Sequence, residues 1–154
     1  MTSSGEIWFY HLERSSVEET LPPLLEKCLE RGWRALVRSP NKERLDSLDT
    51  LLWTYKPSSF LPHAKMTGEG ANDERQPILL ETGAASISDT FPALFLLDGA
   101  DWTGIEGVAR IFVIFDGRDE DALKRARTDW RRSKDSGLSP AYWRQSEDGK
   151  WART

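Results

Sequence analysis

Hydrophobic residues along the chain follow two patterns, which alternate from the N-terminus to the C-terminus. Short β-prone runs occupy residues 7–11, 33–38, 78–81, 93–97 and 109–115. Longer segments, in which apolar residues recur at the spacing of one helix face, predict helices at 21–31, 41–53 and 119–136. The runs at 93–97 and 109–115 are apolar without interruption, which is typical of strands that are covered on both faces. The alternation predicts a three-layer α/β fold with a mostly parallel sheet, formed as a single domain over residues 1–154.

The first helix has recognisable start and stop signals. Ser16 and Glu19 have the spacing of a capping box, and Gly32 ends the helical pattern. Two prolines follow the box, at positions 22 and 23, and they place the first full turn of the helix near Leu21.

Two segments have neither a strand nor a helix pattern. Residues 55–77 contain three Pro and two Gly without a sustained period, which predicts a long loop of the kind that is often functional. Residues 143–151 place Asp148-Gly149 between short β-prone pieces, which predicts either a small hairpin or an extended tail.

Composition limits the classes of protein that the chain can represent. With 38% hydrophobic and 30% charged residues and no apolar run of membrane-spanning length, we expect a soluble globular protein. The single cysteine, Cys28, excludes an intramolecular disulfide, falls on the inward face of the first helix and fits a cytoplasmic location. The N-terminus shows no signal peptide. A net charge of -4 argues against general binding of duplex DNA.

A small nucleotide-dependent enzyme is an alternative that this fold class suggests. The chain has no G-x-G-x-x-G after its first strand and no G-x-x-x-x-G-K-[ST], and Gly68-Glu69-Gly70 does not sit between a strand and a helix. Two histidines and one cysteine cannot form a Cys/His metal cluster. We therefore predict no metal, no cofactor and no catalytic site.

Four carboxylates lie at or just after predicted strand ends, where α/β enzymes hold catalytic groups: Asp98, Asp116, Asp119 and Glu120. Asp-Gly pairs make turns, however, and acidic residues favour the positive end of a helix, so the structural interpretation is the stronger one. His63 has no partner that the sequence identifies.

The segment 124–134, KRARTDWRRSK, is a basic patch in an acidic chain, with six Lys or Arg against one Asp. Arg127 and Arg131 are four residues apart with Trp130 between them, so the three share one side of a helix. Two guanidiniums beside an indole suit an acidic peptide tail with an aromatic ring, and single-stranded DNA is the rival ligand. Because Trp130 shares its side with Leu123 and Ala126, the patch fits equally a solvated helix face with a core tryptophan.

Six blocks of sequence carry a resemblance to a known family: FYHL at 9–12, RGWRALVR at 31–38, LDTLLWTYKPSSFLPH at 48–63, GEG at 68–70 with RQPILL at 75–80, FDGRDEDALKRARTDW at 115–130 and AYWRQSEDGKW at 141–151. Over nearly its whole length the chain resembles the chi subunit of bacterial DNA polymerase III. The resemblance implies a Rossmann-like domain that uses no nucleotide, and a non-catalytic replication subunit.

The resemblance also implies partners. Chi subunits link the clamp loader to the single-stranded-DNA-binding protein by gripping its acidic C-terminal tail, so DNA is contacted mainly indirectly. The tail-binding positions fall on Trp53, Arg127, Trp130 and Arg131, where the family commonly has Tyr and Lys at the last two. The contact with the psi subunit of the clamp loader falls on Phe60, Leu61 and Pro62.

Overall fold

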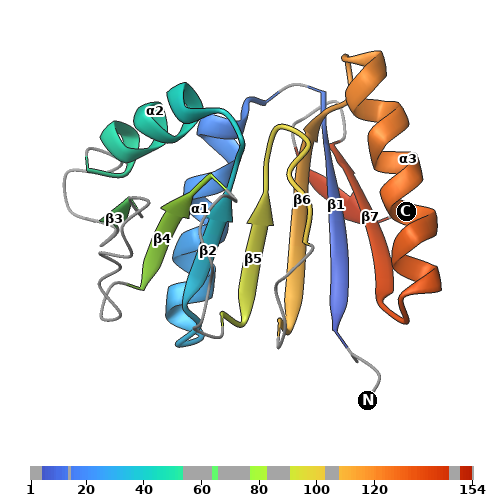
Figure 1. The fold of residues 1–154 in the computed structure, drawn as a ribbon, viewed down its shortest axis with the longest axis horizontal. Coiled ribbons are helices and arrows are strands. Elements are labelled where there is room, and N and C mark those ends of the chain that lie inside the picture. The colour runs from blue at the N-terminus through green and yellow to red at the C-terminus, as the bar shows by residue number, and fades with distance from the viewer. Residues whose placement is uncertain are drawn as a thin grey trace.

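Helices pack on both faces of one sheet in this protein (Figure 1). The computed structural model describes residues 5–13, 15–53, 64–65, 77–82, 91–102, 108–145 and 150–153. The strands are β1 (Glu6–Leu12), β2 (Ala35–Arg38), β3 (Ala64–Lys65), β4 (Ile78–Glu81), β5 (Ala93–Leu96), β6 (Arg110–Asp116), β7 (Ser139–Gln145) and β8 (Trp151–Arg153). The helices are α1 (Val17–Glu30), α2 (Lys42–Trp53) and α3 (Glu120–Asp135).

The strand order within the described sheet is β3-β4-β2-β5-β6-β1-β7-β8. Every neighbouring pair is parallel except β7 and β8, which are antiparallel. The predicted three-layer, Rossmann-like α/β fold with a mostly parallel sheet is therefore confirmed.

Alternate residues of the central strands supply two separate cores. On β1, Trp8, Tyr10 and Leu12 pack with the side chains of α1 and α2. Ile7 and Phe9 point to the opposite face and pack with the side chains of α3. Both faces of the central strands are thus covered, as their uninterrupted apolar runs predict.

Helix α1 begins earlier than its prolines suggest. Ser16 is its N-cap and forms the expected capping box with Glu19. The helix starts at Val17, so the prediction of a first full turn near Leu21 is wrong. The capping box supplies hydrogen bonds at the N-terminus, and Val17 and Leu21 are buried. The stabilisation from these contributions exceeds the cost of the backbone N–H donors that Pro22 and Pro23 lack.

The C-terminal segment belongs to the main sheet. Strand β7 begins at Ser139 and runs parallel to β1, a pairing that the sequence pattern does not predict. The predicted hairpin is confirmed, because Trp143 pairs with Arg153 and Gln145 with Trp151 across β7 and β8. Residues 146–149, with the Asp-Gly pair, lie outside the described residues, as does most of the predicted loop 55–77, in which β3 is described.

Gly117 follows β6 and leaves room for the buried ring of His11. A Cβ atom at position 117 would lie 1.9 Å from Nε2 of His11, and His11 is only 7% exposed. A side chain at this position therefore requires the imidazole to move.

We expect Gly117→Ala to lower the free energy of unfolding more than Gly32→Ala does. Gly32 has a φ of 77° and no atom within 4 Å of an added Cβ, so its replacement costs backbone strain alone, about 1–2 kcal/mol. In a His11→Ala background, Gly117→Ala should cost little, and denaturant unfolding of the four proteins measures this coupling. An equal cost of Gly117→Ala in both backgrounds would contradict the packing described.

Candidate functional site

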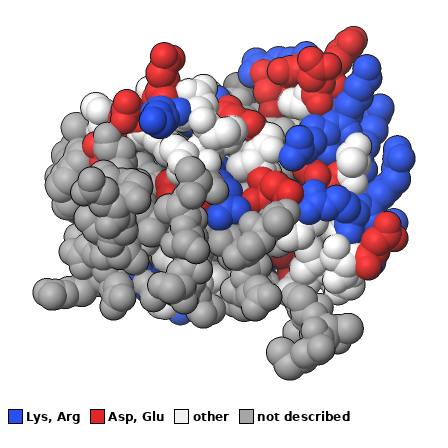
Figure 2. Space-filling view, in the orientation of Figure 1, with Lys and Arg blue, Asp and Glu red and all other residues white. Residues whose placement is uncertain are grey.

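Helix α3 carries opposite charges at its two ends. Asp119 is its N-cap and accepts hydrogen bonds from the backbone N–H groups of Asp121 and Ala122. Acidic residues occupy its first turn, and Arg132 and Lys134 occupy its last, as the helix dipole favours. Figure 2 shows Lys and Arg side chains gathered along α3. The helix therefore presents a cationic surface on a chain whose net charge is -4.

A pocket of about 270 Å³ opens on this surface, between α3 and β7. Its α3 residues recur at the spacing of one helix stripe, and β7 contributes a tyrosine: the lining residues are Leu123, Ala126, Arg127, Trp130, Arg131 and Tyr142. The structure thus brings together three of the four residues predicted to bind the tail.

Aromatic rings form the floor of this α3 pocket. The ring of Trp130 lies 5.5 Å from the ring of Phe9 and 6.0 Å from the ring of Tyr142, between centroids. Trp130 is half-buried and packs on the core, while one side of its ring faces the pocket. The binding and core interpretations of Trp130 are therefore compatible.

A partly buried hydrogen bond holds Tyr142 in place. Its hydroxyl lies 2.6 Å from Nδ1 of His11, and Nε2 of His11 lies 3.2 Å from a carboxylate oxygen of Glu13. Burial lowers the pKa of His11 and raises the pKa of Tyr142, so both groups are neutral near pH 7. A neutral imidazole satisfies both contacts when Nε2–H donates to Glu13 and Nδ1 accepts from Tyr142.

The cations of α3 divide into two groups. Arg125 and Arg132 lie 3.6 Å from the carboxylate of Asp129, and Arg132 also contacts Asp101. Arg127 and Arg131 are exposed and form no ion pair with any residue that the structure describes. Two guanidiniums at the edge of the α3 pocket are therefore available to an external anion.

The remaining predicted residues belong to other segments of the chain. Trp53 ends α2, and α2 packs on the opposite face of the sheet from α3 (Figure 1). The arrangement of the helices therefore does not bring Trp53 to Arg127, Trp130 and Arg131. Phe60, Leu61 and Pro62 lie outside the described residues, as do His63 and residues 68–70.

Sequence reasoning missed two residues of the site, Tyr142 and His11. Tyr142 lies in the block AYWRQSEDGKW that carries the family resemblance, but nothing in that block indicates that β7 lies beside α3. His11 comes from β1 and supports Tyr142 from behind, a relationship that only the parallel pairing of β1 with β7 creates.

The carboxylates at the strand ends have structural partners. Asp98 accepts hydrogen bonds from Ser39 at 2.7 Å and from Nε of Arg44 at 3.1 Å. Asp116 accepts from the backbone and side chain of Arg118, and these bonds lower the pKa of Asp116. Together with the N-cap role of Asp119, these contacts support the turn-and-cap interpretation of the strand-end carboxylates.

The described part of the chain shows neither a metal cluster nor a membrane-spanning helix. No group of three or more His, Cys, Asp or Glu side chains there could hold a metal ion. None of the helices in that part combines the length and the hydrophobicity that a membrane span needs.

Comparison with known proteins identifies both the fold and the family. The chain is similar to the C-terminal domain of the DEAD-box protein Dbp5, with a TM-score of 0.57, 12% identity and coverage of 90% of this chain and 91% of that one. At this identity the likeness concerns the fold alone. No curated protein matches the sequence.

The family model described as "DNA polymerase III chi subunit, HolC" matches residues 4–141. Since this match covers far more than half of the 154 residues, the protein belongs to the chi subunit family of DNA polymerase III, a family of replication accessory subunits.

Proposed function

We propose that the α3 pocket binds the acidic C-terminal tail of single-stranded-DNA-binding protein, and that the protein thereby links that partner to the clamp loader of DNA polymerase III. The observation that carries the proposal is the pair of exposed guanidiniums, Arg127 and Arg131, beside a pocket with Trp130 and Tyr142 at its floor. Membership of the chi family supports the replication context.

The chemistry of such a tail fits the geometry of the α3 pocket. A terminal carboxylate accepts charge-assisted hydrogen bonds from guanidinium groups, and Arg127 and Arg131 lie one helical turn apart. An aromatic side chain next to that carboxylate can pack in the pocket against Trp130 and Tyr142, whose rings already meet edge-on. Acidic residues earlier in the tail meet the basic last turn of α3.

Trp53 is not part of this proposal. It was expected to line the same site, but α2 and α3 cover opposite faces of the sheet. The proposed tail site therefore consists of Arg127, Trp130 and Arg131 with Tyr142 added.

The link to the clamp loader is proposed to run through its psi subunit, with Phe60, Leu61 and Pro62 as the contact. Family membership supports this part of the proposal. We propose that the protein has no catalytic activity of its own. The structural roles of Asp98, Asp116 and Asp119 support that view.

We expect Arg127→Glu to weaken binding of a synthetic acidic peptide ending in Phe about tenfold to a hundredfold. A charge-assisted hydrogen bond contributes about 1.5–3 kcal/mol, and each 1.4 kcal/mol is a factor of about ten in affinity. Titration by fluorescence polarisation measures the effect, with circular dichroism to verify the fold.

Lys124→Glu is the matched control, because Lys124 is exposed on the same helix, undergoes the same change of charge and does not line the α3 pocket. Trp130→Ala is a poorer test, since loss of contact with Phe9 also lowers stability. Equal affinity of wild type and the Arg127→Glu protein would contradict the proposed site. Binding of an oligonucleotide, but not of the peptide, at this site would favour the single-stranded-DNA alternative.

The proposed psi contact has a separate expected outcome. Replacing Phe60 and Leu61 with Ser should abolish recovery of clamp-loader subunits in a pull-down, while the affinity for the acidic peptide stays unchanged. Arg127→Glu should weaken binding of the acidic peptide and leave the recovery of clamp-loader subunits unchanged. If the Phe60 and Leu61 variant recovers clamp-loader subunits as wild type does, the contact lies elsewhere.

A further inference from the structure

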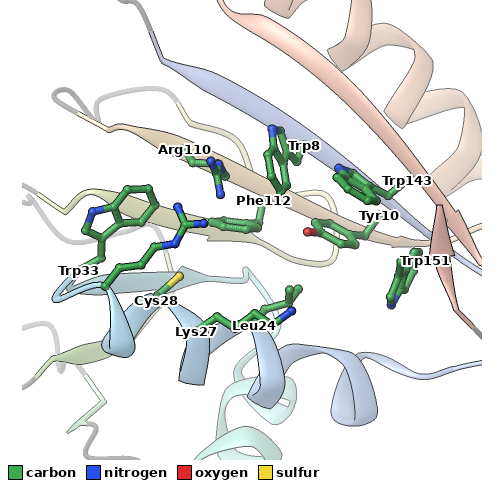
Figure 3. A pocket seen from close by; sticks show the side chains of 11 residues that line it. Trp8, Tyr10, Leu24, Lys27, Cys28, Trp33, Arg110, Phe112, Trp143 and Trp151 are labelled. Atoms are coloured by element: carbon green, nitrogen blue, oxygen red, sulfur yellow. The ribbon is translucent and has the colours of Figure 1, made fainter. Parts of the chain in front are cut away.

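A second pocket lies on the opposite face of the sheet, between α1 and the strands β1, β6, β7 and β8 (Figure 3). Its volume is about 200 Å³. We call it the α1 pocket. Aromatic rings form most of its walls, and three cationic side chains line it with them: Lys27, Arg31 and Arg110.

The rings of the α1 pocket hold one another in fixed positions. The Tyr10 and Trp143 rings stack with an interplanar angle of 8°, and Trp151 meets Tyr10 edge-on at 82°. Trp8 lies 5.2 Å from Trp143, between centroids. A cavity walled by pre-positioned ring faces accepts a planar ligand at little entropic cost.

Two buried donors of residues in this wall lack a hydrogen-bond partner in the part of the chain that the structure describes. Arg110 is held with its guanidinium 3.7 Å from the ring centroid of Trp8, and its Nη2 bonds to Glu6 at 3.1 Å. Its Nε is nevertheless buried without a partner among the described residues, and so is Nε1 of Trp143. Buried donors are nearly always paired in folded proteins, so two in one pocket indicate a ligand that supplies acceptors.

The charge at the edge of the α1 pocket indicates an anion. Lys27 and Arg31 are exposed on α1 and at its C-cap, on the side of the pocket that faces solvent. Cys28 also lines the pocket, but burial raises the pKa of its thiol to about 11. The thiol is therefore protonated near neutral pH and acts as an apolar part of the wall.

We propose that the α1 pocket binds a nucleobase, with the attached phosphate at Lys27 and Arg31. Carbonyl oxygens and ring nitrogens of a base accept hydrogen bonds, and its faces stack on indole and phenol rings. A phenyl side chain offers no acceptor, so it would leave Nε of Arg110 and Nε1 of Trp143 unpaired. Cavities of about 150 Å³ admit a benzene ring, so this pocket has room for one base.

The test observes the indole N–H of Trp143 directly. In a ¹⁵N-tryptophan-labelled sample, Trp143→Phe identifies that signal by its loss. Addition of thymidine monophosphate or of single-stranded oligo(dT) should shift the Trp143 signal in the wild-type protein. If oligo(dT) saturates the protein at a concentration at least about tenfold lower than thymidine monophosphate does, the source of the base is a DNA strand. Equal affinities for the two ligands identify a free nucleotide.

Charge reversal tests whether the nucleotide binds at the α1 pocket and not elsewhere on the surface. Lys27→Glu should weaken nucleotide binding about tenfold, while Lys124→Glu, the same change on the opposite face, should leave it unchanged. Trp143→Phe keeps a ring and removes one donor, so it should weaken binding about threefold to tenfold.

Three outcomes would overturn the proposal. The first is an unshifted Trp143 signal at millimolar nucleotide. The second is equal loss of binding in the Lys27→Glu and Lys124→Glu proteins. The third is a Trp143 shift caused by the acidic peptide but not by the nucleotide. Because tail binding at α3 is measured with the acidic peptide and the Arg127→Glu protein, failure of either site leaves the test of the other intact.

Discussion

The burial of β1 between two parallel neighbours is the constraint on which the structure depends. Because β6 and β7 pair with it along both edges, the apolar side chains of β1 enter one core or the other. Phe9 and His11 support α3 and Tyr142, whereas Trp8 and Tyr10 face α1. One strand of seven residues therefore lines the α1 pocket directly and supports Trp130 and Tyr142 of the α3 pocket from behind.

This shared strand explains why the two pockets have different chemistry. On the α3 side, aromatic rings from two elements meet beneath exposed arginines, so a ligand must bring its negative charge to the surface. On the α1 side, Arg110 is held against Trp8 in the wall, and two buried donors of lining residues have no partner among the described residues. The first arrangement suits a charged chain end, and the second suits a planar group that carries acceptors.

The sequence predicted those parts of the fold that depend on local periodicity. It identified the apolar strands and placed Arg127, Trp130 and Arg131 on one side of α3, since helical spacing alone decides that relationship. It did not predict that Tyr142 joins them, because the pairing of β7 with β1 is a tertiary contact. The sequence also did not predict that α2, which ends at Trp53, lies on the other face of the sheet from α3, because that depends on strand order. The connection through α2 and the connection through α3 run in opposite directions along the sheet, and right-handed crossovers in opposite directions place their helices on opposite faces.

The net charge of -4 bears on how a partner would be selected. A chain of this charge does not attract polyanions over long distances, and at physiological salt, charges further apart than about 8 Å are largely screened. Three of the six cations of α3 are also engaged, Arg125 and Arg132 with Asp129 and Lys134 with the ring of Trp130. Of the other three, Lys124 does not line the α3 pocket, so Arg127 and Arg131 are the cations that an anion would meet there, with the ring of Trp130 beside them. The proposed recognition at α3 therefore favours a ligand that offers an anion and an apolar ring together, which would discriminate a tail from a simple polyanion.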